Sequence, residues 1–226
     1  WAALWLQLTH PETFAGACAL APWPASFESW FGTNLYAVEN AFVRPDGEPY
    51  RYGVWPDGTP TEPARTTWRR ERVVGAGGLF GSFEWAFSPP DAEGRPRPFF
   101  DPATGVIDRE VVEHWSRYDL TRLVERQGEA LARSLADDPI VVKVGGRDNF
   151  RLADPARRFV QACREAGIEV RLELDPEGGH GDIGTMRYQM AVLKAMVDRF
   201  WEITGGEVPR VGADVGGGSR ATTGGR

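Results

Sequence analysis

Apolar residues recur at helical spacing at the start of the chain and then give way to short runs that are apolar throughout. Leu4 and Leu8 repeat one helix turn apart until Pro11 ends the pattern, which predicts a first helix. The run FAGACALAP, residues 14–22, is too short for a helix and predicts a strand buried on both faces, as in a parallel sheet. PIVVKV, residues 139–144, predicts a second strand of the same kind.

The pattern after the second strand predicts a helix, a third strand and a last helix. Asp154 followed by Pro155 is typical of a helix start, with the aspartate as its cap, and Gly167 marks the end of that helix. Residues 168–174, IEVRLEL, alternate apolar and charged side chains, which predicts a strand with one face in water near a sheet edge. Residues 184–203 carry one apolar stripe at helical spacing. The stripe consists of Met186, Met190, Leu193, Val197 and Phe200.

This alternation of strands and helices predicts an α/β fold with a doubly wound, mostly parallel sheet. A large insertion interrupts it at about residues 23–135. Residues 23–107 are rich in Trp, Phe, Pro and Gly without a clean period, so we expect them to be mostly irregular, whereas residues 108–135 return to helical spacing. The glycine-rich tail, residues 205–226, has too little apolar content to pack and is expected to be disordered.

Composition narrows the classes of function. The chain has 226 residues, 42% of them apolar, which suits one domain or part of a larger one. Its formal net charge of −6 argues against a nucleic-acid or anionic-membrane partner, and no apolar run reaches the length of a membrane span. Cys18 and Cys163 lie far apart without metal-ligand spacing, and no cofactor or metal is implied. Trp1 opens the chain inside an apolar segment without a cap, so we expect the natural N-terminus to lie further upstream, and the compartment is not indicated.

The candidate chemistry centres on His180, in the stretch DPEGGHGD at residues 175–182. A solvated loop histidine, a metal ligand and a catalytic base are the three alternatives. Asp148 follows the second predicted strand just as His180 follows the third, and adjacent parallel strands end at the same sheet edge. We therefore predict that the two side chains meet and that the carboxylate fixes the tautomer of the imidazole, which favours the catalytic base.

Three stretches of sequence carry a resemblance to a known family. ALWLQLTHPETFAGACALAP resembles the helix and strand that follow the nucleophile elbow of α/β-hydrolases. VGGRDNFRLADPARRFVQACREAG resembles the acid-bearing loop and helix of the esterase D-like family, which includes S-formylglutathione hydrolase-like and feruloyl-esterase-like enzymes, and GGHGD resembles its histidine loop. EWAFSPPDAEGRPRPFFDPATGVID resembles the insertion of a bacterial esterase-like subgroup.

The resemblance covers about residues 1–203 and implies the C-terminal part of an α/β-hydrolase domain at residues 1–204. It also implies Asp148 as the acid and His180 as the base of a catalytic triad in the order Ser, Asp, His. The serine of the family lies in a Gly-x-Ser-x-Gly turn, which the resemblance places just before Trp1. No serine of this chain has those flanking glycines: Ser26, Ser29, Ser82, Ser88, Ser116, Ser134 and Ser219.

These observations predict a serine-hydrolase-type esterase for a small-molecule ester, represented here by a fragment that is inactive alone because it lacks the nucleophile. Two alternatives remain open: a prolyl-oligopeptidase-like serine peptidase and a non-catalytic hydrolase-fold binding module. The aromatic residues of the insertion either line an acyl or aryl pocket or hold the insertion together. Oligomeric state and the acyl and alcohol specificity are not indicated.

Overall fold

The computed structural model describes residues 1–55, 57–75, 78–135 and 138–206; of the tail expected to be disordered, residues 207–226 lie outside this description. The described chain is mixed α/β, with a three-stranded parallel sheet and seven α-helices, so the predicted class is confirmed. The strands are β1 (Ala17–Leu20), β2 (Ile140–Gly145) and β3 (Val170–Asp175). The α-helices are α1 (Ala2–Thr9), α2 (Ala64–Val74), α3 (Leu79–Phe87), α4 (Arg109–Trp115), α5 (Leu120–Ser134), α6 (Ala153–Glu165) and α7 (Met186–Thr204).

The sheet has the order β1-β2-β3, with all three strands parallel. In the register, β2 residue Ile140 lies between Ala17 of β1 and Val170 of β3. Strand β2 occupies the centre, and its residues Val142 and Val144 are fully buried. Strand β3 forms one edge of the described sheet, as its alternating pattern predicts, and β1 forms the other.

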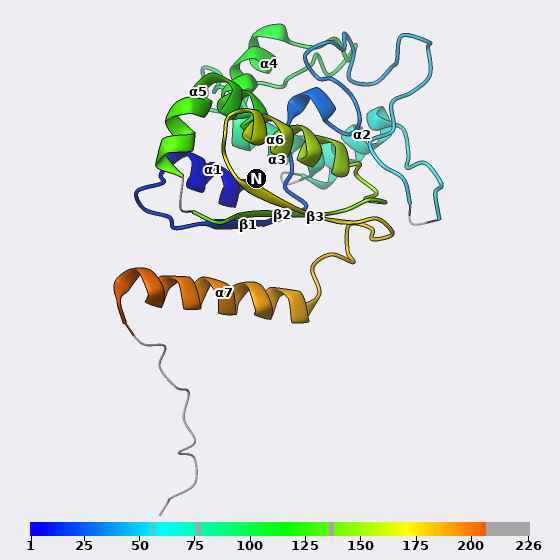
Figure 1. The fold of residues 1–226 in the computed structure, drawn as a ribbon. Helices are drawn as coiled ribbons and strands as arrows, with labels where there is room; N and C mark the ends of the chain where they lie inside the picture. Colours follow the sequence, from blue (N-terminus) through cyan, green and yellow to red (C-terminus); the bar gives the residue numbers. More distant parts are fainter. Residues whose placement is uncertain (56, 76–77, 136–137, 207–226) are drawn as a thin grey trace, which may run out of the picture.

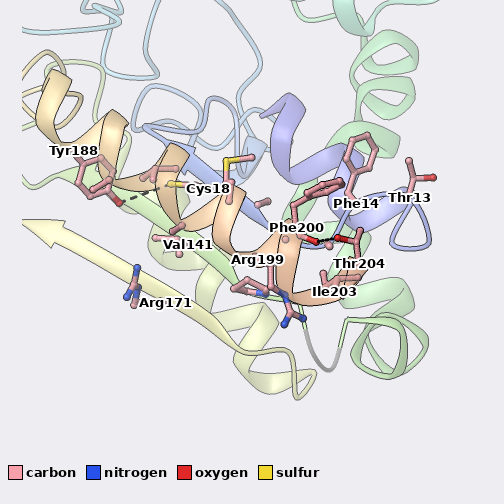
Figure 2. Close-up of a pocket in the computed structure, with 18 residues that line it drawn as sticks. Thr13, Phe14, Cys18, Val141, Arg171, Tyr188, Arg199, Phe200, Ile203 and Thr204 are labelled. Carbon is pink, nitrogen blue, oxygen red and sulfur yellow. Dashed lines mark hydrogen bonds between the residues drawn. The ribbon is translucent and has the colours of Figure 1, made fainter. Parts of the chain in front are cut away.

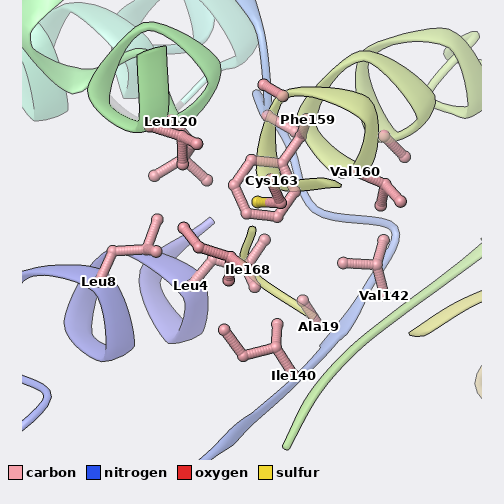
Figure 3. Packing of buried hydrophobic residues seen from close by; sticks show 14 of the residues in the cluster. Leu4, Leu8, Ala19, Leu120, Ile140, Val142, Phe159, Val160, Cys163 and Ile168 are labelled. Carbon is pink, nitrogen blue, oxygen red and sulfur yellow. The ribbon is translucent and has the colours of Figure 1, made fainter. Parts of the chain in front are cut away.

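The sheet is covered on one face by α1, α5 and α6, while α7 lies on the opposite face (Figure 1). The main hydrophobic core fills the first of these layers (Figure 3). Leu4 and Leu8 of α1 pack there with Phe159 and Cys163 of α6 over Val142 of the sheet, and each is at most 2% exposed. Complete burial of a side chain such as Phe159 contributes about 1.5–3 kcal/mol, so this layer holds the strands in place.

The insertion builds a second core. Its residues 23–107 are mostly irregular, as predicted, apart from α2, α3 and the 3₁₀ turn η1 (Phe27–Ser29), and residues 108–135 form α4, the 3₁₀ turn η2 (Ser116–Tyr118) and α5. Its large aromatic side chains pack edge to face against one another. The fully or almost fully buried ones are Phe27, Trp30, Phe31, Phe42, Phe80, Phe99, Phe100 and Trp115. This burial favours the packing alternative for these aromatics, whereas Trp55 and Trp85 are exposed.

Two helix boundaries differ from the sequence prediction. The pattern over residues 108–135 forms two helices, because the chain turns through η2 and Asp119 caps the second helix by accepting a hydrogen bond from the Arg122 N–H at 3.1 Å. The predicted cap at Asp154 is wrong: α6 already begins at Ala153, which places Asp154 inside its first turn. The first difference divides one helical stretch into two helices and the second moves a helix start by two residues, and both leave the layers unchanged.

Helix α7 contacts the sheet through the side opposite its apolar stripe. Tyr188 anchors it, since the hydroxyl donates to Glu173 Oε2 at 2.8 Å and the Lys143 ammonium lies 3.6 Å from the ring centre. Most of the apolar stripe faces away from the sheet, with Met190 and Leu193 more than half exposed, whereas its member Phe200 lines a cavity between α7 and the sheet. The sequence therefore located the stripe, but the tyrosine decides which side of the helix meets the sheet.

Candidate active site

Asp148 and His180 lie on two loops that leave the same edge of the sheet. The first loop follows β2 and the second follows β3, and the two strands stay paired as far as Gly145 and Asp175. Beyond that pair, the Gly146 N–H donates to the Asp175 carbonyl oxygen at 2.6 Å. The parallel register thus continues into the loops and brings their side chains together.

Glycines allow the two loops to pack backbone against backbone. A Cβ atom at Gly145 would lie 2.2 Å from the Gly178 carbonyl oxygen, and one at Gly146 would lie 2.7 Å from that of Pro176. The Arg147 N–H also donates to the Gly178 carbonyl at 3.0 Å. Any side chain at the two glycines would force the loops apart, so this close approach requires glycine.

The predicted contact between the candidate residues is confirmed: His180 Nδ1 lies 2.8 Å from Asp148 Oδ2. The Asp148 side chain is completely buried, whereas 37% of the His180 side chain is exposed. The other carboxylate oxygen, Oδ1, accepts hydrogen bonds from the Phe150 N–H at 2.8 Å and the Leu152 N–H at 3.4 Å. The turn therefore fixes the carboxylate, and the carboxylate orients the imidazole.

This geometry suits a general base. In the tautomer that donates a hydrogen bond from its Nδ1–H to the Asp148 carboxylate, His180 keeps Nε2 as the unprotonated nitrogen. When Nε2 takes a proton, the adjacent carboxylate stabilises the imidazolium cation. The partial exposure of His180 allows a substrate to reach the ring. Of the three sequence alternatives, the geometry favours the base; its catalytic role stays a prediction.

Two aromatic side chains that the sequence analysis did not single out support the imidazole. The Phe150 ring packs edge-on against His180, with ring centres 4.9 Å apart and an interplanar angle of 84°. The Trp23 ring in turn stacks on Phe150, with ring centres 5.0 Å apart. Phe150 follows Asp148 by two residues, so the sequence RDNF was the available signal, but the role of Trp23 depends on the folded insertion.

No nucleophile accompanies this pair within the described residues, where no serine, threonine or cysteine hydroxyl or thiol is hydrogen-bonded to His180. Several serines have structural partners elsewhere: Ser88 accepts from the Trp115 indole and Ser116 donates to the Glu113 carbonyl. Ser219 lies outside the described part of the chain. Burial raises the pKa of Cys163 to about 12, which keeps that thiol protonated and unreactive at neutral pH.

An apolar cavity, whose lining Figure 2 shows, has neither Asp148 nor His180 among its lining residues. It measures about 590 Å³ and lies between α7 and the sheet, lined by Phe14, Cys18 and Val141 on one side and by Phe200 of α7 on the other. Since neither candidate residue lines it, this cavity is not the pocket in which the imidazole would meet a substrate.

Comparison with known proteins assigns no function to Asp148 and His180. No family model matches the chain, and no curated protein matches it. Across the described residues, His, Cys, Asp and Glu form no group of three or more able to hold a metal ion. None of the helices described is long and apolar enough to cross a membrane.

Proposed function

We propose that Asp148 and His180 are the acid and base of a Ser-Asp-His triad in an esterase-type α/β-hydrolase domain that acts on a small-molecule carboxylic ester. The observation that carries this proposal is the 2.8 Å contact between a partly exposed imidazole and a fully buried carboxylate. Its placement at the ends of adjacent parallel strands supports it further, as does the resemblance of both loops to the esterase D-like family.

In the proposed reaction, a serine hydroxyl attacks the ester carbonyl while His180 Nε2 takes its proton. Asp148 keeps the Nδ1 proton in place and stabilises the imidazolium. The imidazolium then gives its proton to the departing alcohol, which leaves an acyl-enzyme. His180 next removes a proton from water, which attacks the acyl carbonyl, and the serine regains its proton as the carboxylic acid leaves.

The proposal requires a nucleophile from outside residues 1–226, because no Gly-x-Ser-x-Gly turn occurs within them. The oxyanion donors that accompany such a turn must come from the same region. We therefore expect residues 1–226 alone not to turn over activated esters. Loss of one triad member already lowers turnover by roughly 10⁴-fold or more, and here the oxyanion donors are missing as well.

The test is p-nitrophenyl acetate hydrolysis by a longer polypeptide that joins residues 1–226 to a natural upstream segment carrying such a turn. We expect His180→Ala and Asp148→Asn each to lower kcat by roughly 10⁴-fold, the latter by favouring the wrong tautomer. The matched control is His10→Ala, which removes an exposed histidine at the end of α1. Full activity in His180→Ala would remove His180 from the mechanism.

The same assay separates the two alternatives. A prolyl-oligopeptidase-like enzyme would cleave peptide p-nitroanilides in preference to the ester. A binding module would have no serine turn upstream and would hydrolyse neither substrate, although Asp148 and His180 would still be in contact.

A further inference from the structure

A second cleft lies between the insertion and the turn that holds Asp148. It measures about 1040 Å³ and is lined by loop residues of the insertion together with Arg151. Three of its lining residues are basic, namely Arg44, Arg51 and Arg151, and one is acidic, Glu39. The cleft therefore carries an excess of positive charge in a protein whose formal net charge is −6.

The backbone holds Arg151 in a conformation that is unfavourable for arginine. Its φ angle is +61°, in the left-handed region that residues other than glycine rarely adopt. The turn enforces it, because the Arg151 N–H donates to the Asp148 carbonyl oxygen at 2.9 Å while the Asp148 carboxylate binds the amides on either side. Such strain persists only where the surrounding structure imposes it, and it clusters at functional sites.

The insertion is shaped to receive this arginine. Gly32 has a φ of +77°, and a Cβ atom there would lie 2.9 Å from Arg151 Cδ and 3.0 Å from its Nη1. A side chain at position 32 would therefore displace the guanidinium from the cleft. Two left-handed positions far apart in the sequence thus combine to place one guanidinium group.

Most of the positive charge in the cleft has no carboxylate partner. Arg44 forms an ion pair with Asp46 at 2.9 Å, but Arg51 donates to a neutral group, the Thr61 carbonyl oxygen. Within the described part of the chain, neither Arg51 nor Arg151 forms an ion pair with an acidic side chain. Guanidinium groups bind carboxylates and phosphates through paired N–H donors, so both are available for such a ligand.

We propose that this cleft binds a small molecule through a carboxylate or phosphate group held by Arg51 and Arg151. Arg151 follows Asp148 by three residues in the same turn, so the cleft adjoins the loop that carries the proposed acid, although neither Asp148 nor His180 lines the cleft itself. Under the proposed function, on which this extension rests, the substrates would be esters that carry a second, anionic group. Anion binding itself does not depend on that function.

Binding is tested on residues 1–226 by NMR titration of the arginine Nε–H signals with succinate and, separately, with inorganic phosphate, in a low-chloride buffer. The neutral dimethyl succinate is the ligand control. Arg151→Asn removes the guanidinium while keeping a residue that tolerates the left-handed backbone. Arg133→Gln is the matched control, since Arg133 is an exposed arginine of α5 paired with Glu129.

We expect saturable binding of at least one anion that weakens with added salt, about tenfold or more weaker binding in Arg151→Asn and in Arg51→Gln, and none for the diester. Whichever of the two anions binds more tightly identifies the group. Equal weakening by Arg133→Gln, equal binding of the diester, or no binding of either anion would overturn the proposal. Urea unfolding of each variant separates a lost site from a lost fold.

The extension is tested in the longer polypeptide with matched neutral and anionic p-nitrophenyl esters, the acetate and the hemisuccinate. We expect Arg151→Asn to lower the ratio of kcat/KM for the anionic ester to that for the neutral ester by about tenfold. An unchanged ratio would refute the extension. Absence of all hydrolysis would refute the proposed function, and the binding result would stand by itself.

Discussion

Glu84 should make the protein less stable as the pH rises from acidic to neutral. It lies on the buried face of α3 beside Phe80, Phe83 and Phe87, where its Oε1 atom has no hydrogen-bond partner. Burial raises the pKa of Glu84 from 4.5 to about 7, although Arg72 and a backbone hydrogen bond oppose this shift. Because the residue is only 9% exposed, solvent screens the effect little.

The direction and size of this change in stability follow from the pKa of Glu84 in the unfolded chain, 4.5, and in the folded protein, about 7. Between pH 4.5 and about 7 the folded protein holds this proton more tightly than the unfolded chain does, so stability falls as the pH rises through that range. Below this pH range the Glu84 carboxyl group is protonated in both the folded and the unfolded protein, so its titration does not change the free energy of unfolding. Above it, at about 1.4 kcal/mol per pH unit, the buried charge lowers the free energy of unfolding by roughly 3 kcal/mol.

Glu84→Gln removes this titration while keeping the shape of the side chain. Urea unfolding followed by tryptophan fluorescence should show the variant more stable than the wild type by up to about 3 kcal/mol at pH 8, and no more stable at pH 4. Both conditions avoid the isoelectric point near 5.2. Glu169→Gln, at an exposed position, should show no such change. A stability difference that is equal at both pH values would refute the reasoning.

Two further predictions concern packing and association. Asp119→Ala should lower the free energy of unfolding by about 3 kcal/mol, because it removes a helix cap and leaves the buried Phe27 N–H without its acceptor. Asp108→Ala, at the partly exposed cap of α4, should lower it by only about 1 kcal/mol, and equal losses in urea unfolding would contradict this. The free edge of β1 and the exposed stripe of α7 should cause concentration-dependent self-association, which Leu193→Glu reduces in sedimentation velocity; a wild type that stays monomeric at high concentration would contradict it.

The strands and α6 were predictable because their signals are local. Alternation in β3, continuous apolar runs in β1 and β2, and the Gly167 stop each act within a few residues. Helices α2 and α3 of the insertion were not predicted, unlike α4 and α5. Helix α3 is short, and much of its packing comes from aromatic side chains elsewhere in the insertion, such as Phe99 on Phe80. The periodicity of a short segment carries no information about contacts with residues that are distant in the sequence.

For the candidate site, too, contacts that follow from strand order were predictable, whereas contacts with distant parts of the chain were not. The contact between Asp148 and His180 followed from strand order alone, because neighbouring parallel strands end at one edge. The stacking of Trp23 on Phe150 and the placement of Arg151 against Gly32 depend on residues that are distant in sequence. The sequence around each of these residues therefore does not predict the contact.

The way the Asp148 carboxylate is shared has a consequence for how such a site is inherited. One oxygen binds the amides of its own turn and the other binds His180, so every group that orients the imidazole through hydrogen bonds lies within residues 140–182. That stretch is a single strand–helix–strand unit with its two loops. Under the proposed function, this unit carries the oriented base as a cassette that can pass intact between proteins, while the nucleophile and the insertion vary around it and the proton acceptor need not be rebuilt.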